Sequence, residues 1–123
     1  MTHRTVTLPT LDHGEITLPE PSWCAGHAHH DPNTRYADVT HAGPESELQF
    51  RHAVLLAASI CAQPNATNPS LGLGGAMPGI SVFPLGESLD PAGADALAAA
   101  LVEYAVELRK LARQLSAALG GER

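Results

Sequence analysis

The sequence predicts an α+β protein with a small antiparallel sheet, an N-terminal β-hairpin, a Cys/His-rich loop and one long C-terminal helix. Three observations lead to this prediction: two short alternating segments around a turn, a proline-bracketed stretch without a hydrophobic period, and a leucine pattern of helical spacing near the C-terminus. With 123 residues, 44% of them hydrophobic, the chain fits a single domain over 1–123 with one core. Because only 4% of the residues are aromatic, we expect that core to be modest and aliphatic.

The first 19 residues are expected to form the hairpin. Thr5-Val6-Thr7-Leu8 and Glu15-Ile16-Thr17-Leu18 alternate apolar and polar positions and are rich in β-branched residues. Between them, Asp12-His13-Gly14 supplies turn residues and a glycine that can take a positive φ.

Residues 20–44 are predicted to be a metal-binding loop. Prolines bracket this stretch, which shows no hydrophobic period. A loop of this length in a compact domain is usually functional or stabilised by a specific interaction, and metal coordination is one such interaction. Thiolate and imidazole are preferred zinc ligands, and clustering them in sequence lowers the chain entropy lost when they converge. The loop contains one of the two cysteines and four of the seven histidines: Cys24, with His27, His29, His30 and His41.

Spacing ranks the candidate ligands within this loop. Cys24 and His27 have the separation found in zinc knuckles, and Gly26 gives the backbone the freedom for a tight turn. In an extended loop His29 leaves on the same side as His27, whereas His30 points away and serves as a supporting or solvent histidine. The alternative is an exposed histidine-rich loop with a partly buried cysteine. A Cys/His nucleophile is disfavoured because no third orienting group or oxyanion-hole motif is visible.

Residues 47–85 are predicted to hold β-strands joined by a Gly/Pro-rich loop. The apolar positions from Leu48 to Ile60 alternate with polar ones, which favours a strand, although the alanines and leucines of 53–58 also suit a helix begun at Ser46. A partner strand is expected at Gly79-Ile80-Ser81-Val82-Phe83. The glycines of 71–75 lack the following Lys-Ser or Lys-Thr of a phosphate-binding loop.

Residues 90–119 are predicted to form the helix. Asp90 can cap it, Pro91 suits the first helical position, and Gly120-Gly121 ends the run. This helix covers one face of the sheet, or meets a second copy or another protein through its apolar stripe, which is longer than a small sheet requires. The stripe follows heptad spacing through Leu97, Leu101, Tyr104, Leu108, Leu111, Leu115 and Ala118.

Charge and hydropathy exclude several classes of partner. The net charge of -6, from 7 basic and 13 acidic residues, argues against binding nucleic acid or anionic lipid. The N-terminus lacks an apolar signal segment, and the run 53–58 is far shorter than the roughly 20 residues that cross a bilayer. We therefore expect a cytoplasmic protein whose two cysteines do not form a structural disulfide.

The chain resembles a family of small uncharacterised actinobacterial proteins that are known only as a domain of unknown function. The resemblance is carried by Pro21-Ser22-Trp23-Cys24 with a histidine shortly after, by Asp38-Val39-Thr40-His41-Ala42-Gly43-Pro44, and by the segment Leu97–Leu115. It implies a Cys…Cys…His…His zinc site in which Glu20 stands where the first cysteine is expected. The implied ligands are then Cys24, one of the histidines 27, 29 and 30, and His41, with Glu20, another histidine or water in the fourth place.

Two functions are compatible with these features. The first is a non-enzymatic zinc-binding protein, in which a structural metal supports a protein-interaction module. The second is a metal-dependent enzyme or metal-handling protein with an open three-ligand site. Coordination number separates the two, because four protein ligands close the site whereas three plus water leave it open. The sequence favours the first.

Overall fold

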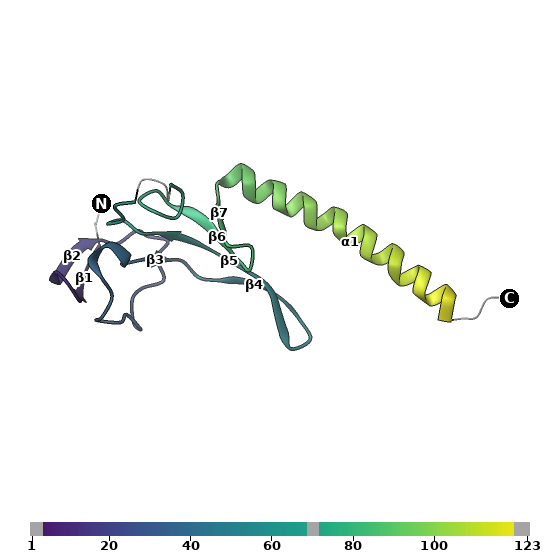
Figure 1. Cartoon of the computed structure of the whole chain (residues 1–123), viewed down its shortest axis with the longest axis horizontal. Helices are drawn as coiled ribbons and strands as arrows, with labels where there is room; N and C mark the ends of the chain where they lie inside the picture. The colour runs from purple at the N-terminus through teal and green to yellow at the C-terminus, as the bar shows by residue number, and fades with distance from the viewer. Residues whose placement is uncertain (1–3, 69–71, 120–123) are drawn as a thin grey trace. The chain divides into compact units, whose positions relative to one another are not determined.

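The computed structural model describes residues 4–68 and 72–119. The chain divides after Asp90 into two compact units, 1–90 and 91–123. The first unit holds the strands and the second holds the helix α1 (Figure 1). The predicted α+β class, with an N-terminal hairpin, an antiparallel sheet and one long C-terminal helix, is confirmed.

The predicted N-terminal hairpin is present. Strand β1 (Thr5–Thr10) pairs antiparallel with β2 (Gly14–Pro19). At the turn Gly14 has a φ of 62°, in the left-handed region that glycine adopts without strain. The Thr10 hydroxyl donates to the Gly14 carbonyl at 2.7 Å and accepts from the His13 N–H at 2.9 Å, so the turn's polar groups are satisfied locally.

A small apolar core lies against this hairpin. Leu8 and Leu18 are buried, and Val39, only 1% exposed, packs with them. Val6 and Ile16 are partly buried against the same cluster. Val39 follows the short 3-10 helix η1 (Tyr36–Asp38), so the loop is anchored to the hairpin through one aliphatic side chain. This agrees with the expectation of a modest aliphatic core.

The second sheet has five antiparallel strands. Their order is β3-β5-β6-β7, and β4 also pairs with β5, next to the stretch that β3 occupies. The strand predicted at 79–83 is β6 and pairs with β5 as expected. The bounds are β3 (His41–Ala42), β4 (Ser46–Phe50), β5 (Ala53–Ala62), β6 (Gly79–Phe83) and β7 (Glu87–Leu89).

The single strand expected from Leu48 to Ile60 is wrong, because the structure divides it into the hairpin β4–β5. The turn is at Arg51 and His52, and Arg51 has a φ of 57°. Phe50 and Ala53 face each other across the two-residue turn, which shifts the alternation by one residue, and a register shift between Leu48 and Gln49 shifts it back, so that Leu48 pairs with Leu56. The helical alternative for this region is excluded.

Helix α1 (Pro91–Leu119) confirms the predicted helix and its first residue. The glycines 120 and 121, expected to end it, lie outside the described residues. Several apolar side chains on the helix are exposed, including Tyr104 at 61% and Leu108 at 53%. Among the described residues, no helix combines the length and the hydropathy needed to span a membrane.

Candidate metal centre

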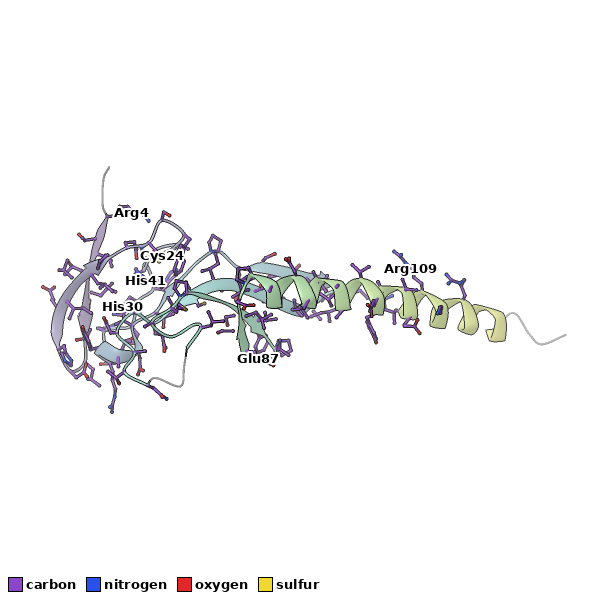
Figure 2. All side chains as sticks on the ribbon, turned by 90° about the horizontal axis from the view of Figure 1, so that it is seen from above. Arg4, Cys24, His30, His41, Glu87 and Arg109 are labelled. Atoms are coloured by element: carbon purple, nitrogen blue, oxygen red, sulfur yellow. The ribbon has the colours of Figure 1, made fainter. Side chains whose placement is uncertain are left out.

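Four side chains with metal-binding atoms converge in the first unit. Glu20 directly follows β2, Cys24 and His27 lie in the loop, and His41 is the first residue of β3. One donor atom from each of the four lies within 4.8 Å of the other three. Figure 2 shows Cys24 and His41 close to the N-terminal hairpin. The structure thus brings together four of the five predicted ligands from three separate segments.

Nε2 of His27 has the other three donor atoms around it. It lies 3.0 Å from Oε1 of Glu20, 3.3 Å from Nδ1 of His41 and 3.5 Å from Sγ of Cys24. Nδ1 of His41 lies 3.0 Å from the same Glu20 oxygen. A zinc ion with bonds of about 2.0–2.3 Å holds tetrahedral ligands roughly 3.3–3.8 Å apart. These four separations of 3.0–3.5 Å are near the lower end of this range and all donor atoms lie within 4.8 Å of one another, so the cluster is compact enough for a single ion.

Hydrogen bonds alone do not satisfy this arrangement. A neutral imidazole nitrogen carries at most one hydrogen, yet Nε2 of His27 faces a carboxylate oxygen, an imidazole nitrogen and a sulfur atom. A cation between the four atoms accepts a lone pair from each of them. The convergence is therefore more typical of coordination than of a hydrogen-bond network.

The candidate ligands are also shielded from water. The side chains of Glu20 and His27 are each 8% exposed and that of His41 is 3% exposed. Cys24 is buried as well, at 7%. Burying a carboxylate is costly unless it is paired or coordinates a metal. A cation at this place supplies that compensation.

Two of the four groups have shifted pKa values. Burial raises the pKa of Glu20. Hydrogen bonds with His27 and Cys24 and the charges of the two histidines lower it by a larger amount, so the net shift is downward. Burial lowers the pKa of His41 and outweighs the opposing effect of the Glu20 carboxylate. At neutral pH both shifts favour the forms that bind a metal, a carboxylate and an uncharged imidazole.

A tight turn presents the cysteine. The Cys24 N–H donates to the Pro21 carbonyl at 3.1 Å, and the Gly26 N–H donates to the Cys24 sulfur at 3.4 Å. Gly26 has a φ of 104°, where a residue with a side chain would be strained. The predicted need for backbone freedom at Gly26 is confirmed. The two hydrogen bonds thus fix the position of Cys24 beside the other three candidate ligands.

Strand β3 fixes the position of His41. His41 pairs with Ala62 on β5, and the Ala25 N–H donates to the Ala42 carbonyl at 2.9 Å, which joins the cysteine turn to the sheet. His41 also makes a hydrogen bond with the backbone of Pro19, in which the imidazole must be the donor because proline has no N–H. Ligating histidines commonly donate their other N–H in this way. Sequence reasoning missed these supports, since backbone carbonyls leave no signal in residue types.

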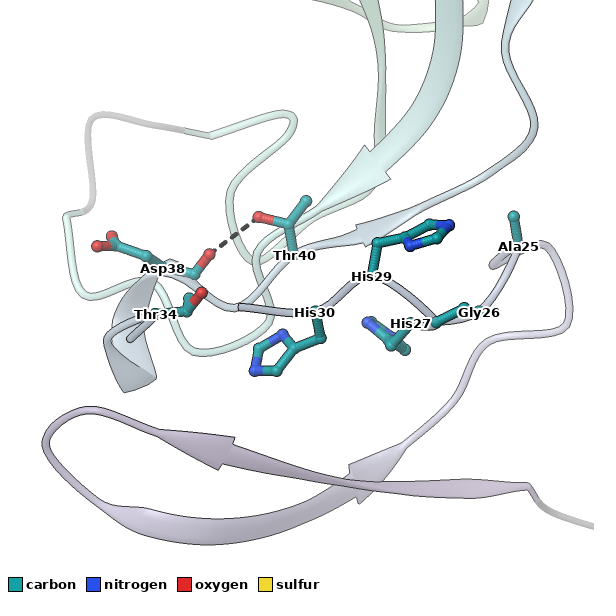
Figure 3. Close-up of a pocket in the computed structure, with 9 residues that line it drawn as sticks. Ala25, Gly26, His27, His29, His30, Thr34, Asp38 and Thr40 are labelled. Atoms are coloured by element: carbon teal, nitrogen blue, oxygen red, sulfur yellow. Dashed lines mark hydrogen bonds between the residues drawn. The ribbon is translucent and has the colours of Figure 1, made fainter. Parts of the chain in front are cut away.

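His29 lies outside the cluster. The prediction for it assumed an extended loop, but residues 27–30 form a turn in which the His30 N–H donates to the His27 carbonyl at 3.0 Å. Figure 3 shows His29 leaving the loop on the opposite side from His27 and His30. The exposed His29 lines a cavity of about 540 Å³ together with both of these histidines. Nε2 of His30 donates to the Pro9 carbonyl at 2.8 Å, so this histidine joins the loop to the hairpin.

Comparison with known proteins places this chain in a family without assigning an activity. No curated protein matches it, and no solved structure matches it. A family model described as "Domain of unknown function (DUF6907)" matches residues 5–117, which include all four residues of the cluster. The chain therefore belongs to the DUF6907 family.

Proposed function

We propose that this protein is a small, non-enzymatic zinc-binding protein in which one structural ion is held by Glu20, Cys24, His27 and His41. The observation that carries the proposal is the convergence of four buried donor atoms within 4.8 Å of one another. Two of these residues, Cys24 and His41, lie in the motifs on which the family resemblance rests. The proposal makes those motifs a zinc-binding signature.

The donor set supports zinc as the ion. One thiolate, two imidazoles and one carboxylate combine ligand types that suit zinc and are less suited to calcium or magnesium, which prefer oxygen. A thiolate and a carboxylate also balance the two positive charges of zinc. The resulting centre is neutral overall, which is compatible with its burial.

A structural role is supported by where the ligands come from. The ion joins the end of the hairpin, the cysteine turn and strand β3, so it connects the two-stranded sheet to the five-stranded one. The apolar cluster beside the hairpin contains few buried side chains, and small cores commonly need a metal or a disulfide. Four protein ligands fill a tetrahedral site and leave no position for substrate.

We propose further that the stabilised fold presents surfaces to another protein. Large apolar side chains at helical spacing are exposed on α1, among them Leu101 at 40%, Tyr104 at 61% and Leu108 at 53%. An exposed apolar row of this kind is typical of protein interfaces. The net charge of -6 supports a protein partner rather than nucleic acid or an anionic membrane.

Metal analysis tests the zinc proposal. Protein purified without a histidine tag should contain one equivalent of zinc by elemental mass spectrometry, and Cys24→Ser should lose most of it because a thiolate ligand is removed. Cys61→Ser is the matched control, since Cys61 lies outside the cluster and should leave the metal content unchanged. Stoichiometric metal in both Cys24→Ser and His41→Ala would contradict the proposed site.

One observation favours the alternative, a metal-dependent enzyme or metal-handling protein. His27 lines the cavity of about 540 Å³, so a small molecule could approach one side of the cluster. In that case Glu20 leaves the ion and water takes its place. Zinc affinity separates the two, because Glu20→Ala should weaken zinc binding at least about tenfold if Glu20 is a ligand and should hardly change it if water already fills the fourth place.

A further inference from the structure

Gly43 lies where the turn that carries the cysteine meets the second sheet. It directly follows β3, and its N–H donates to the Ile60 carbonyl on β5 at 2.8 Å. A Cβ atom at this position would lie 3.0 Å from the carbonyl oxygen of Trp23 and 3.6 Å from that of Ile60. Residue 43 is thus enclosed between the backbones of two other segments.

This close approach, rather than backbone conformation, accounts for the glycine. Gly26, in the same loop, needs the freedom of glycine because its φ is 104°, but the φ of Gly43 is outside the left-handed region. Ordinary van der Waals contacts of a Cβ atom begin at 3.4 Å, so at 3.0 Å the neighbouring backbone would have to move by a few tenths of an ångström. Space therefore excludes a side chain at Gly43.

Either movement that makes room for a side chain displaces a candidate ligand. The atom in the way is a backbone carbonyl oxygen and not the end of a flexible side chain. Trp23 directly precedes Cys24, so a shift of its carbonyl group also shifts the thiolate. A shift of Gly43 in the other direction moves His41, which is two residues before it on β3.

We infer that Gly43 is a positioning residue of the metal centre, because its lack of a side chain lets Cys24 approach His41 closely enough for both to bind one ion. The inference rests on the proposed zinc function. Zinc–ligand distances in well-formed sites vary by only about 0.2 Å, so a displacement of a few tenths of an ångström is enough to weaken coordination. Trp23 and Cys24 lie in one motif of the family resemblance, and His41 and Gly43 lie in another. The contact gives these two motifs a common structural role.

The zinc affinity of the full chain tests the inference. Gly43→Ala should raise the dissociation constant for zinc by about ten- to a hundredfold, as the loss of a residue that supports a ligand does. Gly79→Ala is the matched control. A Cβ atom at Gly79 would also meet its nearest neighbours at 3.0 Å, but these belong to Leu73 and Gly74, outside the cluster. The control should leave the zinc affinity unchanged even where it lowers the stability.

Two spectroscopic signals show whether the coordination itself has changed. With cobalt(II) in place of zinc, Gly43→Ala should weaken or shift the thiolate-to-metal absorption band, whereas Gly79→Ala should reproduce the parent spectrum. Trp23 is the only tryptophan of the chain, and its ring centre lies 6.3 Å from that of His41, so its fluorescence should follow metal binding. If Gly43→Ala does not fold without metal, a zinc titration followed by this fluorescence gives the affinity from the concentration at which the fold returns.

Hydrogen exchange at the Ala25 amide tests the close approach without relying on metal. The Ala25 N–H donates to the Ala42 carbonyl at 2.9 Å, so this bond joins the cysteine turn to β3. Gly43→Ala should speed exchange there both with zinc and without it.

Three results would overturn the inference: an unchanged zinc affinity and cobalt spectrum in Gly43→Ala, an equal loss of affinity in Gly43→Ala and Gly79→Ala, or unchanged exchange at the Ala25 amide in Gly43→Ala. A parent protein that binds no zinc would instead contradict the proposed function. The Ala25 exchange would then still decide whether Gly43 sets the distance between the cysteine turn and β3.

Discussion

At the residue scale, Glu20 decides the character of the metal centre. Its Oε1 atom lies 3.0 Å from both imidazole nitrogens, and its charge is the second negative charge needed to neutralise zinc. A carboxylate is a weaker zinc ligand than a thiolate, because zinc is borderline-soft. The family resemblance implies a cysteine at this position, so the proposed zinc site of this chain has a donor set that is less rich in sulfur.

Two different substitutions of Glu20, by cysteine and by glutamine, should therefore change zinc affinity in opposite directions. Glu20→Cys supplies a thiolate and should tighten binding, whereas Glu20→Gln removes the charge and should weaken it at least about tenfold. Competition with a chromogenic chelator measures both. Glu15→Gln, at an exposed position of β2, makes the same change away from the cluster and should have no effect. Equal affinity in all three variants would place Glu20 outside the coordination sphere.

At the element scale, the loop between β2 and β4 depends on single contacts more than on regular structure. Within it the structure shows η1 and the two-residue strand β3. The backbone N–H of Leu11 donates to the Thr34 carbonyl at 2.9 Å, and the Gly43 N–H donates to the Ile60 carbonyl at 2.8 Å. One side of the loop is thus joined to the hairpin turn and the other to the second sheet.

Asp12 makes one of these contacts and gives it a pH dependence. Its carboxylate accepts a hydrogen bond from the Tyr36 N–H at 2.8 Å, and this bond is the main cause that lowers the pKa of Asp12 below the ordinary value of 3.8. Because the folded pKa is lowered, the stabilisation is present above pH 3.8 and is lost as the pH falls through the folded pKa.

Hydrogen exchange at the Tyr36 amide tests this contact. Asp12→Ala should speed exchange at neutral pH, because the acceptor is gone. Asp12→Asn keeps an acceptor oxygen but does not titrate, so it should retain slow exchange at neutral pH and lose the acid dependence that is specific to Asp12. Each variant keeps the four candidate ligands. Comparing its exchange rate with that of the parent protein therefore cancels any effect of acid on metal binding. An unchanged rate in Asp12→Ala would contradict the role of this bond.

The elements also show how far the sequence could lead. The N-terminal hairpin and helix α1 follow from local patterns, namely alternation around a glycine turn and a heptad that begins at Pro91. The β4–β5 turn was missed because the register shift between Leu48 and Gln49 offsets the change of parity at the turn, and because Arg51 is not a typical residue for a positive φ. Strand β3 was missed because two residues carry no period.

The candidate ligands likewise include residues that the sequence identifies and one that it places wrongly. Residue types and spacing identified Cys24, His27 and His41, and the family resemblance added Glu20. His29 was included because side-chain direction was inferred for an extended chain, whereas residues 27–30 turn. Which histidine of a closely spaced set meets a distant strand depends on backbone conformation that residue types do not specify.

At the scale of the whole molecule, the two compact units are stabilised in different ways. In the first unit the candidate metal centre connects the two sheets, while the apolar cluster of Leu8, Leu18 and Val39 is small. The second is a single alanine-rich helix, whose composition favours helix formation. Loss of metal should therefore affect the first unit and leave the helix largely intact.

Removal of the metal from the full chain tests this separation. At a free zinc concentration a thousandfold above the dissociation constant, zinc binding adds about 4 kcal/mol to the free energy of unfolding. A chelator should therefore lower the melting temperature of the first unit markedly and speed hydrogen exchange across residues 20–44. Acid should have a similar effect, because protons compete with zinc for the thiolate and imidazole groups. The helical circular dichroism signal should persist at neutral pH, since α1 contains none of the four candidate ligands. Cys24→Ser protein is the control, because it should already exchange rapidly and should not respond to the chelator. If chelation removes the helical signal as well, the two units are coupled; if it leaves exchange in 20–44 unchanged, the metal does not stabilise the fold.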